Sequence, residues 1–311
     1  MNNSNASPNE EYVNPSLGKI GEMYFDERNN RIKFFSTTIH SSPDSVRSLI
    51  AQGKEMMDDK GATRLNARFF VRDFTLEGNV EAAIPLNSSF RGTQLVFIGI
   101  NRGKRIDSSE VLLAEEDLIR EVLREPLHNC HGLSAGYSFE RLTPLNLRPY
   151  DIRDMSSLYS QAFTTYTASL DEASLLEMIR NSIVYCARDK DEGKIVSTSV
   201  AEIGKVPTSN GNFGICELSE MATLPEHRGR GISTSLTQAL VHEISSKVDL
   251  IYAEARACSL SVNKVFHNLG FNFAGRLMKQ CILSGCYDIE ENGPYENLNV
   301  WYISPHPRGR T

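Results

Sequence analysis

The chain of 311 residues has no apolar run near the roughly 20 residues that a membrane-spanning helix needs. Its first residues, MNNSNASPNEEYVNPS, contain no basic stretch followed by an apolar one, so no secretory signal is expected. Positive charge is not in excess either, because the formal net charge is −6. A nucleic acid backbone demands a basic surface, so we expect no nucleic acid and no membrane as a partner. These absences favour a cytoplasmic protein.

Cysteines are few and are not arranged in motifs. Six are scattered along the chain without a CxxC pair: Cys130, Cys186, Cys216, Cys258, Cys281 and Cys286. We interpret them as reduced residues of a cytosolic protein. His128, Cys130 and His131 form one metal-like cluster, but no second cluster lies at zinc-site spacing. A polar linker is the favoured interpretation there, and no metal site is predicted.

The composition is otherwise that of a folded protein, with 40% hydrophobic and 23% charged residues. Residues 1–16 are rich in Asn, Ser, Pro and Glu, which predicts a disordered tail. The length exceeds the roughly 100–200 residues of one domain. We therefore expect an N-terminal α/β unit at 17–125, a linker at 126–140 and a second α/β domain at 141–304. The linker mixes Gly, Ser, His and Asn without a sustained period.

Hydrophobic periodicity and turn residues predict the elements of both parts. In the first part, strands are expected at 19–25, 31–38, 64–71, 80–84 and 93–100, and helices at 42–59 and 110–124. In the second part, strands are expected at 141–148, 183–188, 194–203, 214–224, 250–256, 271–283 and 298–303, and helices at 150–163, 170–181, 232–246 and 261–269.

The most informative segment is ELSEMATLPEHRGRGIS, from Glu217 to Ser233. It joins an apolar strand, a Pro turn, and two glycines, Gly229 and Gly231, that open an amphipathic helix. Small residues let the backbone approach a phosphate, and the unpaired N–H groups of a helix start point toward it. Arg228 adds positive charge, as does Arg230. The pattern indicates an anion cradle, with a plain helix-start turn or a solvated Arg/Gly loop as the alternatives.

No Gly-Lys-Ser/Thr follows these glycines and no GxGxxG is present, so the two common nucleotide-binding loops are excluded. The segment resembles the signature of the GCN5-related N-acetyltransferases, Arg/Gln-x-x-Gly-x-Gly/Ala. Residues 228–233 match it except for Ser233 at the last position. The sequence MATLPE at 221–226 and NLGF at 268–271 is also similar to that superfamily.

The resemblance implies an α/β (α+β) fold with a mixed, mostly antiparallel sheet, flanked by helices and splayed between its fourth and fifth strands. It implies acetyl-CoA as a co-substrate, with no metal. Backbone groups of the fourth strand would pair with the pantetheine arm, and the helix start would hold the pyrophosphate. The cofactor-binding residues expected on this basis are Met221, Ala222, Thr223, Leu224, Arg228, Gly229, Arg230, Gly231, Ile232, Ser233, Ser259 and Phe266.

Attack of an amine on a thioester needs a base, and two carboxylates of the fourth strand are candidates. Residues three apart on a regular strand lie on opposite faces, unless a bulge of the kind that the superfamily has intervenes. Glu217 falls where several members place a catalytic glutamate, and we predict it as the base. Glu220 is the second candidate, as base or amine-binding group. An ordinary strand carboxylate is the alternative for each.

Many members place a tyrosine, as the acid for the leaving thiolate, where this chain has Phe266. Cys258, Ser259 and Ser261 are near enough in sequence to replace it. Protonation of the thiolate by water is the alternative.

From about residue 31 to 303 the chain also resembles the bacterial and archaeal β-lysine N-acetyltransferases, at VEAAIP (80–85), FRG (90–92), ATLPEHRG (222–229) and NVWY (299–302). That resemblance implies a small-molecule amine as partner: β-lysine, acetylated on its terminal amine to N-ε-acetyl-β-lysine, a compatible solute. The chain departs from the family at Cys258, at Leu260 and in its insert at 286–296. The alternative acceptors are a polyamine, another diamino acid or a protein lysine, and the alternative function is that of a non-catalytic CoA-binding sensor. The oligomeric state is left open by the sequence, with a homodimer as one alternative.

The N-terminal unit has no Arg-Gly-x-Gly loop, so we do not expect it to bind CoA. One interpretation is a degenerate partial copy of the acetyltransferase fold that completes the sheet or walls the acceptor pocket. Ordinary structural packing is the other.

Overall fold

The computed structural model describes residues 17–72, 80–87, 90–103, 105, 108–127, 136–163, 171–209, 211–283 and 287–305. The predicted tail at 1–16 and the cluster at 128–131 lie outside the described residues.

The first part of the chain forms β1 (Tyr24–Asp26), β2 (Arg31–Phe35), α1 (Pro43–Lys60), β3 (Arg64–Arg72), β4 (Val80–Pro85), β5 (Thr93–Asn101) and α2 (Ser109–Arg124). The second part forms β6 (Tyr137–Leu142), α3 (Asp151–Ala162), α4 (Glu172–Asn181), β7 (Ile183–Asp189), β8 (Ile195–Thr208), β9 (Gly211–Thr223), a 3₁₀ turn (Pro225–His227), α5 (Ile232–Ile244), β10 (Leu250–Arg256), α6 (Leu260–Asn268), β11 (Asn272–Ile282), α7 (Ile289–Asn292) and β12 (Tyr295–Ile303).

Most predicted elements are present within a few residues of their expected bounds, with three differences. The strand expected at 19–25 shrinks to β1, because Gly21 turns the chain with a φ of +90°. β6 begins at Tyr137, inside the predicted linker, and residues 143–148 are not in a strand. Pairing with β7 from Tyr137 to Leu142 sets these bounds, and a local pattern of Gly and Ser could not reveal it. The 3₁₀ turn and α7 were not predicted.

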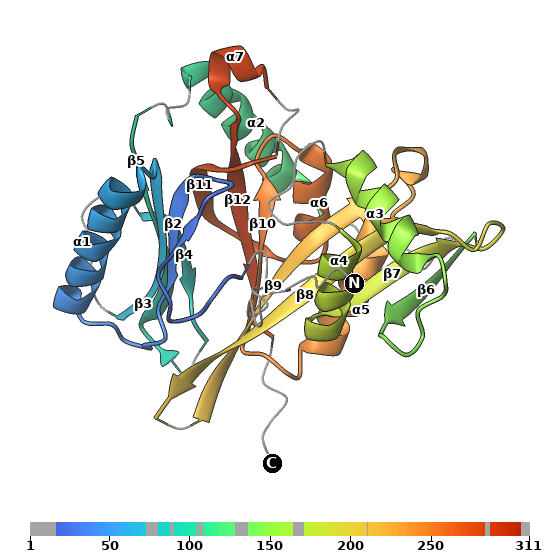
Figure 1. Ribbon diagram of the computed structural model, residues 1–311, viewed down its shortest axis with the longest axis horizontal. Coiled ribbons are helices and arrows are strands. Elements are labelled where there is room, and N and C mark those ends of the chain that lie inside the picture. Colours follow the sequence, from blue (N-terminus) through green and yellow to red (C-terminus); the bar gives the residue numbers. More distant parts are fainter. Residues whose placement is uncertain are drawn as a thin grey trace, which may run out of the picture.

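All of these strands form one sheet, in the order β1-β2-β3-β5-β4-β11-β12-β10-β9-β8-β7-β6 (Figure 1). Only β2–β3 and β9–β10 are parallel among the paired neighbours. The predicted fold class, a mixed and mostly antiparallel sheet with flanking helices, is therefore confirmed. The order is symmetric about the β4–β11 junction, since β1-β2-β3-β5-β4 mirrors β8-β9-β10-β12-β11 with the parallel pair in the same place.

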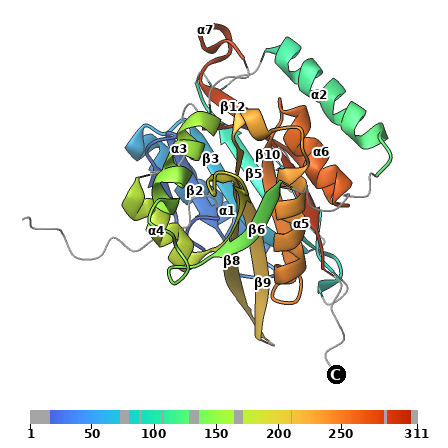
Figure 2. The ribbon, with the colours of Figure 1, turned by 90° about the vertical axis from the view of Figure 1, so that its right-hand side faces the viewer.

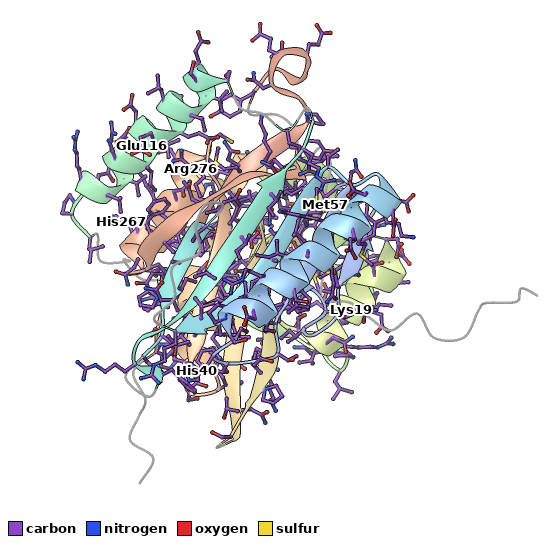
Figure 3. All side chains as sticks on the ribbon, turned by 90° about the vertical axis from the view of Figure 1, so that its left-hand side faces the viewer. Lys19, His40, Met57, Glu116, His267 and Arg276 are labelled. Atoms are coloured by element: carbon purple, nitrogen blue, oxygen red, sulfur yellow. The ribbon has the colours of Figure 1, made fainter. Side chains whose placement is uncertain are left out.

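Helices cover both faces of this sheet (Figure 2). α3 and α4 pack on β7 and β8, and α5 lies on the other side of these strands. α6 packs against α2 and β10. Arg276 of β11 lies near Glu116 of α2, and α1 covers the outer face of β2 and β3 (Figure 3).

The strands β2 and β3 have one apolar and one polar face. Ile32 and Phe34 alternate with Arg31 and Lys33, and on β3 the apolar Leu65, Ala67 and Phe69 alternate with Arg64, Asn66 and Arg68. The apolar set packs with Val46 and Met57 of α1. The polar set faces the second part of the chain, where Arg68 contacts residues of β9 and β10. The sheet therefore curves until β3 faces strands that are far from it in the strand order.

Among the described residues, no helix combines the length and apolar character needed to cross a bilayer.

We predict that Gly275→Ala weakens the junction between the two parts of the sheet. Gly275 pairs with Ala82 of β4 at a φ of +142°, and a Cβ there would lie 2.3 Å from the carbonyl oxygen of Glu81. Overpacking and backbone strain together should lower the free energy of unfolding by about 2–4 kcal/mol, measured by urea denaturation. Gly136→Ala is the control, because nothing lies within 4 Å of its added Cβ. Equal stability of the two variants would contradict the tight junction.

Candidate active site

The parallel strands β9 and β10 separate partway along their length. Their pairing runs from Ile215 with Leu250 to Leu218 with Ala253 and goes no further, although both strands continue. Beyond this point the β9 edge from Ser219 to Thr223 lines a cavity instead of meeting β10. The splay expected between the fourth and fifth strands of the second part is therefore present.

A β-bulge lies in β9 at the splay. The register with β8 shifts between the pairs Val200–Ser219 and Thr198–Ala222, and Glu220 adopts a φ of +47°. The extra residue breaks the alternation of side chains along the strand. Glu217 and Glu220, which would face opposite ways on a regular strand, consequently both line the same cavity.

Glu217 is held in a buried network by Arg68 from the first part of the chain. Arg68 Nη1 lies 3.3 Å from Glu217 Oε2 and donates a 2.6 Å hydrogen bond to the Tyr252 hydroxyl, which in turn donates to Glu217. Arg68 Nη2 lies 2.5 Å from Glu254 Oε1. Burial raises the pKa of Glu217 to about 7, although Arg68 and the Tyr252 hydrogen bond oppose that rise. Arg68 and Tyr252 therefore both hold the Glu217 carboxyl group in place.

Arg68 itself is 2% exposed and lies against the rings of Phe35, Phe97 and Tyr252, 5.2 to 5.4 Å from their centroids. Burial disfavours its charge, but Tyr252, Glu254 and Glu217 together raise its pKa, so it stays cationic.

The carboxyl group of Glu220 differs from that of Glu217 in its hydrogen-bond partners. It is 2% exposed, and neither of its side-chain oxygens has a hydrogen-bond partner within the described part of the chain. Burial raises the pKa of Glu220 to about 8. A carboxyl group with this pKa and no fixed partner can take up and release a proton near neutral pH.

The predicted anion cradle lies at the start of α5. Gly229 and Gly231 have φ values of +74° and +73°, and an added Cβ at either position would meet nothing within 4 Å. None of the described side chains caps the N-terminus of α5. Arg228 binds the Thr223 carbonyl, and Arg230 binds the Tyr137 hydroxyl and the Glu226 carbonyl, so both arginines hold the loop in place. The open space and the uncapped N–H groups fit an anionic group.

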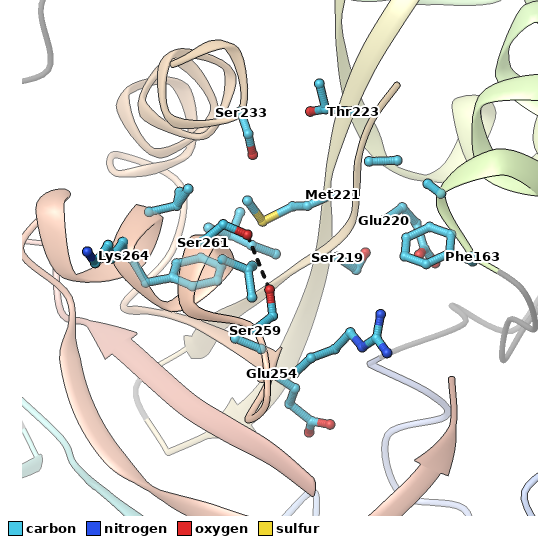
Figure 4. A pocket seen from close by; sticks show the side chains of 18 of the residues that line it. Phe163, Ser219, Glu220, Met221, Thr223, Ser233, Glu254, Ser259, Ser261 and Lys264 are labelled. Atoms are coloured by element: carbon cyan, nitrogen blue, oxygen red, sulfur yellow. Dashed lines mark hydrogen bonds between the residues drawn. The ribbon is translucent and has the colours of Figure 1, made fainter. Parts of the chain in front are cut away.

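One cavity of about 710 Å³ connects the cradle with the two glutamates. Figure 4 shows Ser233 and Thr223 toward one end, Glu254 toward the other, and Glu220 beside Phe163 between them. Of the predicted cofactor-binding residues, those lining the cavity are Met221, Ala222, Thr223, Arg228, Gly229, Arg230, Gly231, Ile232, Ser233, Ser259 and Phe266. Leu224 does not line it, because its side chain packs in the core between β8 and α5 and its N–H binds the Val196 carbonyl.

The candidates for the acid that replaces a tyrosine at position 266 are Ser259, Ser261 and Cys258. Ser259 and Ser261 line the cavity, and their hydroxyls lie 3.2 Å apart (Figure 4, dashed line). Cys258 is disulfide-bonded and so has no thiol proton to give. This corrects the expectation that all cysteines are reduced, whereas Cys186, Cys216 and Cys281 are free and buried.

Sequence reasoning offered walling of the acceptor pocket as one role of the first part of the chain, but it named none of the residues that reach this site. Arg68 binds two cavity-lining glutamates, and Arg31 and Lys33 of β2 line the cavity themselves. The available signal was the alternation of basic with apolar residues at 31–34 and 64–69, which gives each strand a charged face. Within the described ranges, no group of three or more His, Cys, Asp or Glu side chains is arranged to hold a metal ion.

Comparison with known proteins adds a family match. Residues 212–280 match the family model described as FR47-like protein. A β-lysine N(6)-acetyltransferase of Methanosarcina mazei is 35% identical over 153 residues, which cover 49% of this chain and 51% of that protein. The N-acetyltransferase YodP of Bacillus subtilis is 29% identical over 154 residues, covering 49% of this chain and 50% of YodP. The chain thus spans about half the length of the curated relatives it matches.

Solved structures similar to part of the chain include Arabidopsis thaliana NAA60 in complex with acetyl-CoA, at 12% identity and a TM-score of 0.43, covering 54% of this chain and 98% of that one. The ribosomal-protein-S5-alanine acetyltransferase of Vibrio fischeri matches at 13% identity and a TM-score of 0.44, covering 56% and 96%. The family match over 212–280 confirms the predicted resemblance to the GCN5-related N-acetyltransferases.

We predict that Arg68→Met destabilises the protein strongly, because it leaves Glu217 and Glu254 buried without their cation. Breaking a buried ion pair in this way costs about 3–5 kcal/mol in the free energy of unfolding, measured by urea denaturation. The control is Arg47→Met, which removes an exposed ion pair with Asp44 and should change stability by less than about 0.5 kcal/mol. A similarly small loss for both variants would show that Arg68 does not hold the two parts together.

Proposed function

We propose that this chain, whose resemblance to the GCN5-related N-acetyltransferases is confirmed, is an acetyl-CoA-dependent N-acetyltransferase that acts on the terminal amine of a small amino acid. The observation that carries the proposal is the buried carboxyl group of Glu220, which shares one cavity with the start of α5. Within the described residues, its side-chain oxygens have no hydrogen-bond partner and no side chain caps α5. A proton acceptor and an anion cradle are what amine acetylation from a CoA thioester needs.

The residues around the cradle fit the phosphate groups of acetyl-CoA. Gly229 and Gly231 leave the space that a side chain would fill, and the free N–H groups of α5 favour negative charge. The β9 edge from Ser219 to Thr223, which β10 does not pair, offers backbone groups to the amides of a pantetheine arm. Acetyl-CoA supplies the activated acetyl group as co-substrate.

Glu220 is the proposed base, in place of Glu217, because Glu217 is already engaged by Arg68 and Tyr252. The acceptor ammonium loses a proton to the Glu220 carboxylate. The amine nitrogen then forms a bond to the acetyl carbon as the carbon–sulfur bond breaks, and the electron pair stays on sulfur. The acylated nitrogen then loses its second proton and the sulfur gains one, so that a proton passes in net from nitrogen to sulfur through the Ser259–Ser261 hydroxyl pair or water. Glu217 serves to position the acceptor through the Arg68 network.

β-Lysine is the proposed acceptor, giving N-ε-acetyl-β-lysine, because two of the curated relatives are named β-lysine N(6)-acetyltransferases. A compatible-solute role, a cytoplasmic location and a homodimer remain predictions.

We further propose that residues 17–125 are a degenerate partial copy of the domain at 141–304. The symmetric strand order supports it, since β2-α1-β3 corresponds to β9-α5-β10 and both contain the parallel pair. The copy supplies the polar face of β2 and β3 that closes the cavity.

We predict that kcat of the wild type rises with pH through an apparent pKa near 8, because Glu220 must lose its proton to act as base. Glu220→Gln should lower kcat by about 100-fold or more and leave acetyl-CoA affinity nearly unchanged.

The pH dependence of the free energy of unfolding gives a second readout. Burial raises the folded-state pKa of Glu220 above its unfolded value, so its favourable contribution is present below about pH 4.5 and is lost as pH rises through about 8.

Urea denaturation should therefore give Glu220→Gln a higher free energy of unfolding than the wild type above pH 8. The difference between variant and wild type should be about 3–5 kcal/mol larger there than at pH 4.5. Glu226→Gln, at an exposed position of the 3₁₀ turn, is the control and should change neither profile. Full activity of Glu220→Gln would remove this residue from the role of base.

The acceptor is tested by thiol release from acetyl-CoA with β-lysine, α-lysine, ornithine, spermidine and a lysine peptide. We expect preferential turnover of β-lysine.

Gly229→Asp should abolish turnover and weaken CoA binding at least about 10-fold, because a carboxylate at the cradle blocks the approach of the backbone to the ligand and repels the pyrophosphate. Turnover of another amine alone would overturn the substrate, and no turnover despite CoA binding would favour a sensor.

A further inference from the structure

The hydroxyl group of Ser219 has a fixed direction at the wall of the cavity. Ser219 is the last residue of β9 before the register shift of the bulge, and it lines the cavity with 9% of its surface exposed. Its Oγ donates a 2.8 Å hydrogen bond to Glu202 Oε1 of the neighbouring strand β8. Within the described part of the chain, this is the one hydrogen bond that the Ser219 side chain makes.

The carboxyl group that accepts this hydrogen bond is itself anchored. Glu202 is 0% exposed, and its Oε2 accepts a 2.9 Å hydrogen bond from the backbone N–H of Leu17. On the β8–β9 ladder Glu202 lies opposite Glu217, so it is the diagonal neighbour of Ser219, whose own partner is Val200. Because Glu202 does not line the cavity, the hydrogen of the Ser219 hydroxyl points away from the cavity.

The direction of this hydrogen decides what Ser219 offers to a ligand. A hydroxyl group has one hydrogen to donate and two lone pairs that accept. Since the hydrogen is engaged by Glu202, the cavity meets only the lone pairs of Ser219 Oγ. Ser219 therefore cannot stabilise the oxyanion that develops on a thioester carbonyl, which requires a donor. The group that it can bind is an N–H.

The bulge places a second acceptor beside Ser219. Glu220 is the next residue and lines the same cavity, and Figure 4 shows both side chains there. Consecutive residues of a regular strand face opposite ways, and the φ of +47° at Glu220 breaks this alternation. A titratable carboxyl group and a hydroxyl oxygen of constant charge therefore accept side by side. A protonated amine, with three N–H groups, is complementary to such a pair.

We propose that Ser219 binds the reacting amine of the acceptor by accepting a hydrogen bond from one of its N–H groups. This rests on the proposed function and adds a substrate-binding residue to it. The ammonium gives one proton to the Glu220 carboxylate, one of the two remaining N–H groups points at Ser219 Oγ, and the freed lone pair is left to face the acetyl carbon. Ser219 forms and breaks no covalent bond, so it orients the nitrogen without acting as a base.

The test uses binding, so that it does not depend on turnover. Affinities of the CoA-loaded full chain for β-lysine and for β-aminohexanoic acid, which lacks the terminal amine, are measured by calorimetry. We expect Ser219→Ala to weaken β-lysine binding about 10-fold or more, because a hydrogen bond from a charged donor is lost. Binding of β-aminohexanoic acid should change less than about 2-fold, and so should the affinity of the unloaded chain for CoA.

Kinetics separate Ser219 from the proposed base. Ser219→Ala should raise KM for β-lysine about 10-fold or more and leave the pH dependence of kcat as in the wild type, whereas Glu220→Gln lowers kcat itself. Ser199→Ala is the matched control, because Ser199 is a buried serine of β8 that does not line the cavity. It should bind both probes and CoA as the wild type does.

Four results would overturn the assignment. They are unchanged β-lysine affinity in Ser219→Ala, an equal loss for both probes, no binding of β-lysine to the wild type, and a matching loss of CoA affinity. The last would show that the Ser219 lone pairs serve a pantetheine amide. Failure of the proposed function is separate: Ser219→Ala would then still lose β-lysine binding, but the wild type would release no thiol from acetyl-CoA.

Discussion

The buried ion network around Arg68 is the interaction on which the architecture of the site depends. A guanidinium at 2% exposure is costly to desolvate, and here it is compensated by two carboxylates, a phenol hydroxyl and three aromatic rings. Arg68 belongs to β3, while its acidic partners belong to β9 and β10. The network is therefore satisfied only when the sheet curves enough to bring these strands face to face.

The curvature also decides which glutamate is available. With Glu217 paired to Arg68, the one carboxyl group of β9 that lacks a partner among the described residues is Glu220, which the bulge turns into the same cavity. The two glutamates are three residues apart and both are buried, yet their electrostatic surroundings differ. Burial, opposed by a backbone hydrogen bond of Glu220 itself, raises the pKa of Glu220 to about 8, and burial opposed by Arg68 raises that of Glu217 to about 7. Both values are suited to proton transfer near neutral pH, so the two glutamates differ in their fixed partners.

The symmetric strand order describes how the first part of the chain joins the second. In both parts a parallel pair is extended by two antiparallel strands, and the edge strands β4 and β11 meet at the junction. Joining the edges removes two exposed strand edges and continues the curvature from one part into the other. The first part has no glycine cradle in its sequence, and we propose that it serves the second part by closing the acceptor side of the cavity with charged groups.

The sequence by itself determined most of the elements, the fold class and the glycine loop that opens α5. Hydrophobic periodicity is a local property, and the cradle from Arg228 to Ser233 is formed by consecutive residues, so both can be read along the chain. Which glutamate is free, that Leu224 packs in the core, and that Arg31, Lys33 and Arg68 reach the site were decided by the tertiary structure. These depend on a bulge and on contacts between residues as far apart as Arg68 and Glu217, and no local pattern encodes the curvature that brings such residues together.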